Sequence, residues 1–179
     1  MKGVSCLFQE PEVTSDFKNC ENKNETGAES PFEHKVTLEF AVEGKNFRAA
    51  GEASSRLKHT LQHIGFPAPL VRRVAVAAYE AEMNIIIHAN RGTLKAEITP
   101  KTVTIWAEDE GPGIPDIELA MQEGYSTAPD YIREMGFGAG MGLPNIKKCS
   151  DILEIETVIG AGTRLKMVIF NKTGPEREK

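Results

Sequence analysis

Two stretches of the chain carry glycine at a density that a packed core does not require. One is the turn Asp109-Glu-Gly-Pro-Gly-Ile-Pro115, and the other, from Gly136 to Leu143, has glycine at every second position. Glycine buries no side chain and costs backbone entropy, but it lets main-chain N–H groups approach a ligand closely. A glycine-rich segment leading into a helix N-terminus suits anions, because unpaired N–H groups and the helix dipole face the same point. The second stretch therefore predicts a phosphate-binding loop.

Two polar residues, Glu80 and Asn84, interrupt an apolar segment that runs from Val74 to Ile87. Because they are four residues apart, they lie on one face of the predicted helix. A helix that is apolar nearly all round is expected to be buried, and a buried carboxylate or amide requires partners. We interpret Asn84 as an oxygen ligand for Mg²⁺ and Glu80 as a base for an attacking hydroxyl. The alternative is a solvent-exposed polar stripe; Glu82, on the opposite side, is expected at an edge.

Asp109 follows a predicted strand and precedes Gly-Pro-Gly. Its carboxylate can therefore accept a hydrogen bond from an exocyclic amine, such as the 6-amino group of adenine. The alternative is an ordinary turn aspartate, since aspartate is common in turns. Together with the glycine-rich segments, Asp109 predicts a nucleotide site with the phosphates under the second glycine segment.

Other nucleotide motifs are absent from the sequence. There is no Gly-x-x-x-x-Gly-Lys-[Ser/Thr], which excludes a P-loop protein. Glycine at every second position does not match the Gly-x-Gly-x-x-Gly of dinucleotide-binding domains, in spacing or in position. Without His-Arg-Asp or Asp-Phe-Gly, the eukaryotic-type protein kinase fold is also excluded.

The elements that position these residues are predicted from hydrophobic periodicity. Alternating apolar residues predict strands at 35–42, 94–98, 103–107, 153–157 and 165–169, and helical spacing predicts helices at 47–64, 70–89, 115–122 and 143–150. Arg91-Gly92 is expected to turn, and 123–135 to form an irregular mobile lid over the site. The order favours an α/β (α+β) two-layer sandwich, in which helices cover one face of a mixed, mostly antiparallel sheet.

Composition predicts where the folded domain begins and ends, which partners are not expected and in which compartment the protein acts. Residues 1–32 are polar and are predicted to be a disordered extension, 33–170 to form one domain, and 171–179 to be a polar tail. A net charge of -5 does not suggest a surface for nucleic acid or anionic lipid. No apolar run approaches the roughly 20 residues of a membrane span. Cys6, Cys20 and Cys149 are odd in number and far apart, which argues against disulfides and for the cytoplasm.

Four segments, in order, resemble the four boxes of the GHKL ATPase superfamily, which includes gyrase, histidine kinases and mismatch-repair proteins. They are Glu80-x-x-x-Asn84, Asp109-x-Gly111-x-Gly113, Gly136-x-Gly138-x-Gly140-x-Gly142 and Gly160-x-Gly162-Thr163. The resemblance spans about Glu33 to Phe170 and implies the Bergerat, or histidine-kinase-like ATPase, fold. Within the superfamily the chain is most similar to small bacterial anti-sigma-factor serine/threonine kinases. Residues 109–127 and 140–148 resemble the switch-type members that act on stressosome proteins.

This resemblance implies ATP and Mg²⁺ as cofactors and a role for each site residue. Asn84 would bind Mg²⁺, Glu80 would be the catalytic base, and Asp109 would bind adenine. The other nucleotide-binding residues would be His88, Gly111, Gly113, Ile114, Gly136, Gly138, Gly140, Met141, Gly142, Leu143 and Thr163. His88 has an equal alternative as a core histidine whose hydrogen bonds are satisfied.

The implied activity is phosphorylation of a serine or threonine on a partner protein. The usual partners of such kinases are STAS-domain antagonist proteins and sigma factors, and the small kinases are often homodimers; neither nucleic acid nor membrane is expected. One alternative is a non-catalytic module that sequesters a sigma factor when ATP orders its lid. Another is a histidine-kinase-type catalytic domain with His59 or His63 as acceptor, although the strand before their helix favours packing on the sheet.

Overall fold

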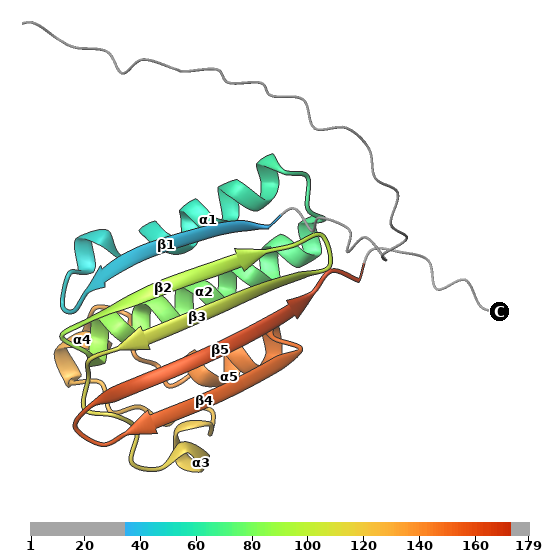
Figure 1. Ribbon diagram of the computed structural model, residues 1–179. Helices are drawn as coiled ribbons and strands as arrows, with labels where there is room; N and C mark the ends of the chain where they lie inside the picture. The colour runs from blue at the N-terminus through green and yellow to red at the C-terminus, as the bar shows by residue number, and fades with distance from the viewer. Residues whose placement is uncertain (1–34, 173–179) are drawn as a thin grey trace, which may run out of the picture. The chain divides into compact units, whose positions relative to one another are not determined.

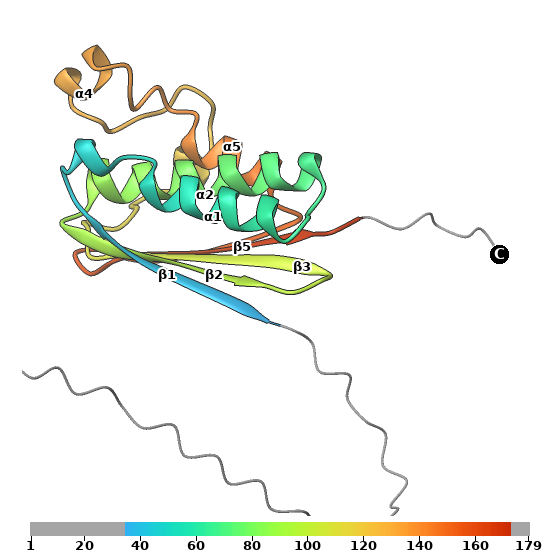
Figure 2. The same cartoon turned by 90° about the horizontal axis from the view of Figure 1, so that it is seen from above.

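The computed structural model describes residues 35–172, which form a five-stranded sheet with helices on one of its faces (Figures 1 and 2). The strand order is β1-β2-β3-β5-β4, and every neighbouring pair is antiparallel. The predicted two-layer sandwich is confirmed, and within the described range its sheet is wholly antiparallel rather than mixed. The predicted extension 1–32, Cys6, Cys20 and nearly all of the tail lie outside the described residues. The strands are β1 Val36–Glu43, β2 Arg91–Ile98, β3 Thr102–Asp109, β4 Ile152–Val158 and β5 Gly162–Phe170.

Alternation along the strands places one row of apolar side chains against the helices. In β3, Val103 and Ile105 are fully buried, whereas Trp106 points to the outer face and is partly exposed. Ile105 pairs with Ala96 of β2 and with Met167 of β5, so the buried row continues across the sheet. The same register places Asp109, the last residue of β3, at the end of the sheet that the helices leave open.

The central helix, α2 (Ala68–His88), is buried along most of its length. It packs against the sheet, as Figure 2 shows, and lies between α1 (Glu52–His63) and α5 (Gly142–Cys149), as Figure 1 shows. Pro69 lies in its first turn, where its missing N–H has no helical partner to lose. Glu80 and Asn84 are only partly buried, so they lie on the one face of α2 that its neighbours leave open. None of the helices in residues 35–172 is both long and apolar enough to cross a membrane.

Three local predictions are wrong. The helix predicted at 47–64 is divided into a 3-10 turn, η1 (Phe47–Ala49), and α1, because Gly51 has a left-handed conformation with φ of 86°. Arg91-Gly92 does not turn but begins β2, where Gly92 pairs with Val42 on one side and Asp109 on the other. The segment 123–135 is not irregular throughout, because it contains a short helix, α4 (Asp130–Glu134), which is anchored by the fully buried Ile132. That this segment acts as a mobile lid stays a prediction.

Glu82 was expected at an edge of its helix, and this prediction is also wrong. Only 2% of the residue is exposed, and its two carboxylate oxygens accept hydrogen bonds from the amides of Ala53 and Ser54, at 3.1 and 3.0 Å. These amides belong to the first turn of α1, whose N-cap residue Gly51 has no side chain to satisfy them. Glu82 therefore caps α1 from the neighbouring helix, with its charge at the positive end of the helix dipole.

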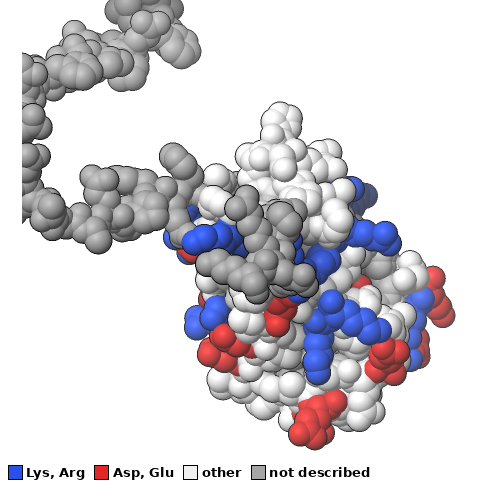
Figure 3. Space-filling model, turned by 90° about the vertical axis from the view of Figure 1, so that its right-hand side faces the viewer, with Lys and Arg blue, Asp and Glu red and all other residues white. Residues whose placement is uncertain are grey.

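Charges of both signs alternate on the outer face of the sheet. Lys35 pairs with Glu97 at 2.9 Å, and Arg164 with Glu108 at 2.9 Å, across neighbouring strands. Figure 3 shows another side of the molecule, where Lys and Arg again lie next to Asp and Glu. Such exposed pairs contribute little to stability, so the fold depends mainly on the apolar layer between sheet and helices.

Candidate functional site

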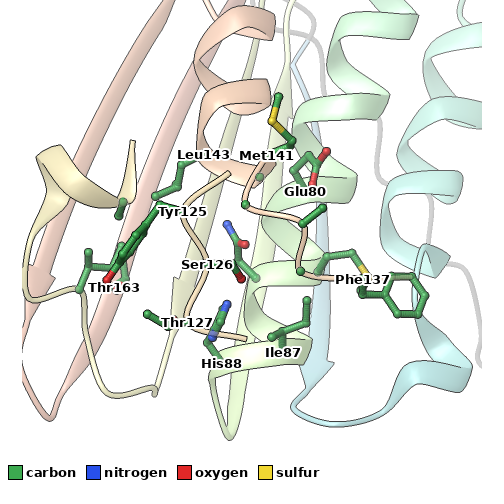
Figure 4. Close-up of a pocket in the computed structure, with 18 of the residues that line it drawn as sticks. Glu80, Ile87, His88, Tyr125, Ser126, Thr127, Phe137, Met141, Leu143 and Thr163 are labelled. Atoms are coloured by element: carbon green, nitrogen blue, oxygen red, sulfur yellow. The ribbon is translucent and has the colours of Figure 1, made fainter. Parts of the chain in front are cut away.

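A cavity of about 550 Å³ opens between α2, the end of β3 and the glycine segment that leads into α5. Glu80 and His88 project toward it from α2, and Thr163 lies across it at the start of β5 (Figure 4). Its remaining wall comes from α3 (Ile117–Ala120) and from the segment Tyr125–Thr127, which precedes α4. All predicted site residues except Gly111 line this one cavity: Glu80, Asn84, His88, Asp109, Gly113, Ile114, Gly136, Gly138, Gly140, Met141, Gly142, Leu143 and Thr163.

The α2 wall is a single helical stripe. Glu80, Asn84 and His88 are spaced by four residues, and Met83 and Ile87 lie between them on the same face. Oε1 of Glu80 accepts a hydrogen bond of 2.7 Å from the side-chain amide of Asn145, in the first turn of α5. The stripe therefore presents a carboxylate, an amide and an imidazole to the cavity, with apolar contacts between them.

His88 lies at the last turn of α2 and is exposed toward the cavity. Although solvent reaches the ring, the surrounding protein partly desolvates it, and this lowers the pKa of His88; the nearby cation of Lys45 lowers it further. The neutral imidazole is therefore favoured at neutral pH. In that form it has one N–H donor and one acceptor, and it adds no positive charge to the site.

Asp109 lies at the other end of the cavity, at the end of β3. Its Oδ1 accepts a hydrogen bond of 3.3 Å from the amide of Thr163. Burial raises the pKa of Asp109, and this outweighs the amides of Thr163 and Gly111, which lower it. Oδ1 is thus bound by the Thr163 amide, and the carboxylate as a whole lines the cavity, where a ligand can reach it.

The chain after Asp109 turns tightly against the β4–β5 hairpin. Gly113 has φ of 74°, and a Cβ there would lie 2.6 Å from the carbonyl oxygen of Val158, so no other residue fits without a shift. The amide of Ile114 donates to Thr157 Oγ1 at 2.8 Å, which in turn lies 3.2 Å from Thr163 Oγ1. These contacts hold Gly113 and Thr163 on the same wall of the cavity. Gly111 shapes this turn from outside the cavity, where a Cβ would meet Asp109 Oδ1 at 2.8 Å.

The second glycine segment packs closely on both the lid and α2. Gly140 has φ of 74°, and a Cβ there would lie 2.4 Å from the backbone of Gly124, whose amide donates to the Gly140 carbonyl at 3.0 Å. At Gly142 a Cβ would lie 3.1 Å from Oδ1 of Asn84 and 3.7 Å from Oε2 of Glu80. The N-terminus of α5 therefore begins directly beside the Glu80–Asn84 pair, where helix amides favour an anion.

The cavity wall is mostly apolar, and the charged side chains on it are acidic. Its side chains include the carboxylates of Glu80, Asp109 and Asp116, and among the described residues that line it none is Lys or Arg. Side-chain cations of the described lining residues could not balance the charge of a polyphosphate there, so main-chain amides or a bound cation would have to do so. The amide oxygen of Asn84 beside Gly142 is the type of neutral oxygen ligand that Mg²⁺ accepts, so the residues present fit that ion.

Several cavity residues were missed by sequence analysis. Met83 and Ile87 belong to the Glu80–Asn84 stripe, and together with Leu165 of β5 they supply apolar contact area; extending that stripe by helical spacing would have found the first two. Phe137 stacks on Phe47 of η1, with ring centroids 5.8 Å apart and planes inclined by 26°. This contact joins the glycine segment to an element far away in sequence, and no periodicity indicates it.

The fold and the cavity define the class of protein. A buried helix that presents an acid and an amide, an aspartate at a strand end and a glycine segment that begins a helix form an ATP-binding domain of the histidine-kinase-like type. The family described as "Histidine kinase-like ATPase domain" matches residues 45–169, and the chain belongs to this family. The predicted superfamily is therefore confirmed.

Similar proteins indicate which kind of member of this family the chain is. The chain is 32% identical over 115 residues to the serine/threonine-protein kinase RsbT of Bacillus subtilis, covering 62% of this chain and 80% of RsbT. It is 35% identical over 144 residues to the anti-sigma F factor of Clostridium acetobutylicum, covering 75% of this chain and 92% of that protein. The RsbU and RsbW domains of Rv1364c from Mycobacterium tuberculosis share the fold, with a TM-score of 0.51 and 15% identity over 75% of this chain and 32% of theirs. The chain is an ATP-binding serine/threonine protein kinase of the GHKL type, as predicted.

Proposed function

We propose that this kinase transfers the γ-phosphoryl group of ATP to a serine or threonine hydroxyl of a STAS-domain antagonist protein. The supporting observation is that one cavity joins Asp109 at one end to Glu80, Asn84 and the start of α5 at the other. The relatives named RsbT and anti-sigma F factor support a partner from a sigma-factor regulatory system.

The Asp109 end of the cavity binds adenine in this proposal. The carboxylate of Asp109 accepts a hydrogen bond from the exocyclic amine, while its Oδ1 stays bound by the Thr163 amide. Met83, Ile114 and Leu165 contact the base through apolar atoms. The amides of the glycine segment and the N-terminus of α5 bind the phosphates.

Glu80 accepts the proton in the transfer step. The substrate hydroxyl gives its proton to Glu80, its oxygen forms a bond to the γ-phosphorus, and the bond from that phosphorus to the bridging oxygen breaks. The electron pair of the broken bond leaves with ADP. Such transfer depends mostly on positioning and charge neutralisation, which suits a site built from main-chain amides.

Asn84 is the metal ligand in this proposal. A bound Mg²⁺ would neutralise phosphate charge, which the cavity's own side chains do not do because they include carboxylates and no Lys or Arg among the described lining residues. Asn84 is suited to this role because its neutral oxygen adds a ligand without adding to the cavity's negative charge.

Substitution of Glu80 tests the assignment of the base. Glu80→Gln keeps the shape and size of the side chain but removes its ability to accept a proton. We expect ADP affinity within a few-fold of wild type and phosphorylation of a STAS partner reduced by at least about a hundredfold, measured by mass spectrometry of the product. Glu39→Gln, on an exposed position of β1, is the matched control and is expected to behave as wild type.

Unchanged phosphorylation by Glu80→Gln would remove Glu80 from the mechanism. A second candidate function is sequestration of a sigma factor, which the relative named anti-sigma F factor favours. The two are separated by incubating partners with the wild-type protein and Mg-ATP. Stable binding without any phosphorylated product would support sequestration, whereas a phosphoserine or phosphothreonine supports the kinase.

A further inference from the structure

Asn145 makes a contact with Glu80 that connects two elements distant in sequence. Its Nδ2 atom donates a hydrogen bond of 2.7 Å to Oε1 of Glu80, from the first turn of α5 to the middle of α2. Asn145 does not line the cavity, so it contacts Glu80 from behind the cavity wall. Asn145 lies in the segment 140–148 that resembles the switch-type kinases, but that resemblance assigns it no role.

The packing of α5 fixes where Asn145 points. The residues on either side of it, Pro144 and Ile146, are buried, and its own amide donates to the Met141 carbonyl at 2.9 Å. Rotation of α5 about its axis would expose those apolar side chains, so the Asn145 side chain is held toward α2. The helix that begins at the predicted phosphate loop therefore also carries the donor to Glu80.

The two oxygens of Glu80 are in different environments. Oε1 is occupied by the Asn145 amide, whereas Oε2 is the Glu80 oxygen that faces Gly142, 3.7 Å from the position that a Cβ would take there. Because Gly142 lines the cavity, Oε2 is the atom presented to a substrate hydroxyl beside the phosphates. A carboxylate without such a donor could rotate and present either oxygen, or turn away.

We propose that Asn145 is a positioning residue that orients Glu80 so that Oε2 receives the proton from the substrate hydroxyl. This inference rests on the proposed role of Glu80 as base. Asn145 donates through a neutral amide, which orients the carboxylate without adding a charge to the site. It also makes the orientation of the base depend on the placement of α5, and hence on the segment proposed to bind the phosphates.

Two substitutions test the proposal in the full chain. Asn145→Asp replaces the donor by a second carboxylate at hydrogen-bond distance from Glu80, and two such groups cannot both be ionised readily. We expect the acidic limb of the kcat–pH profile to move to higher pH by about one unit or more. Asn145→Ala leaves Glu80 free to rotate, and we expect kcat to fall by about tenfold to a hundredfold while the KM for ATP changes less than about twofold.

Lys147→Gln is the matched control for Asn145→Asp. It changes net charge by the same amount, from an exposed position on the same helix, without facing Glu80. We expect its pH profile and kcat to match wild type. A contact that only holds α5 against α2 would lower the unfolding temperature of Asn145→Ala but leave its kcat at the wild-type value, and that result would overturn the proposal.

The outcome for Glu80→Gln separates this inference from the proposed function. Loss of transfer in Glu80→Gln with a wild-type pH profile and kcat in both Asn145 variants would overturn the positioning role alone. Wild-type transfer in Glu80→Gln would overturn both. Because the Asn145→Asp profile is compared within one protein at different pH values, partial destabilisation does not imitate the expected shift.

Discussion

At the scale of single residues, two of the carboxylates that line the cavity lie in different environments. Glu80 has one oxygen bound by the neutral amide of Asn145, and it lies beside the start of α5. Asp109 is half-buried beside the Thr163 amide, and burial raises its pKa. Glu80 is thus placed where the phosphates and the substrate hydroxyl would meet. Asp109 is placed where the exocyclic amine of adenine would bind. The same kind of side chain serves two proposed roles because its surroundings differ.

Substitution of Asp109 tests the proposed adenine contact. In Asp109→Asn the amide of Thr163 favours the side-chain oxygen at the Oδ1 position, so we expect the NH₂ group to face the ligand. That group repels the amine of adenine but can donate to the carbonyl of guanine. A hydrogen bond to a charged group contributes about 1.5–3 kcal/mol, so we expect ADP affinity to fall by about tenfold to a hundredfold and GDP affinity to fall much less. Calorimetric titration of both nucleotides measures this.

The stability of the nucleotide-free protein provides the control for Asp109→Asn. Since folding raises the pKa of Asp109, the ionised form is disfavoured in the folded state, and its contribution to stability is unfavourable above that pKa. The substitution removes this contribution, so the unfolding temperature at pH 7 should rise or stay the same. An ADP affinity equal to that of wild type would contradict the proposed role of Asp109.

At the scale of elements, α1 depends on a residue of α2 for its first turn. Its N-cap, Gly51, provides no side-chain acceptor, and Glu82 receives the amides of Ala53 and Ser54 instead. The carboxylate is buried, but these two charge-assisted hydrogen bonds and the helix dipole offset the cost of removing it from water. The packing of α1 against α2 is therefore specified by a polar contact as well as by Leu57 and Leu61, which are fully buried.

Removal of the Glu82 carboxylate should destabilise the fold. Glu82→Leu leaves two amides at the start of α1 without acceptors, at a cost of about 1–3 kcal/mol for each unsatisfied group. We expect the free energy of unfolding in urea to fall by about 2–4 kcal/mol. Glu52→Leu, an exposed residue in the same first turn, is the control and should change it by less than about 1 kcal/mol. Equal effects of the two substitutions would show that Glu82 does not act as a cap.

The elements differ in how far the sequence predicts them. Strands such as β3 and the limits of α2 are predicted well, because alternation and Pro69 act within a short stretch of chain. The family motifs likewise predicted residues that line one cavity. For Glu82, in contrast, a helical wheel predicts a position at the edge of the helix. This prediction fails because the residue accepts hydrogen bonds from backbone amides 28 and 29 residues away. Asn145 was missed for the same reason, since Glu80 lies 65 residues before it.

At the scale of the whole molecule, one aspartate joins the helical layer to the sheet at the end away from the nucleotide cavity. Asp151 lies just before β4 and accepts from the Arg73 guanidinium of α2 at 2.8 Å and from the Phe170 amide of β5 at 2.8 Å. Lys172 lies 2.9 Å from its other oxygen. Arg73 also donates to the Cys149 carbonyl at the end of α5, at 3.1 Å. The last strand, the first turn after α5 and the central helix therefore meet at this residue.

These contacts predict how the stability of the protein depends on pH. Although burial acts in the opposite direction, hydrogen bonds from the Phe170 amide, Lys172 and Arg73 lower the pKa of Asp151 to about 2. Because the folded pKa lies below the unfolded one, the contribution is present above the unfolded pKa, near 4, and is lost as pH falls through about 2. We expect it to be about 1–2 kcal/mol, reduced by the exposure of Lys172 to solvent.

Urea unfolding of the wild type and Asp151→Asn at pH 7, 4 and 2.5 measures this contribution. The difference in free energy of unfolding should be largest at pH 7 and should shrink toward the lowest pH, because the wild-type carboxylate then begins to be protonated as well. Glu123→Gln removes the exposed ion pair with Lys148 and should leave stability unchanged at every pH. A difference for Asp151→Asn that is the same at all three pH values would mean that the residue acts through its shape rather than its charge. The junction of α2, α5 and β5 would then depend on packing alone, and acid would not weaken it.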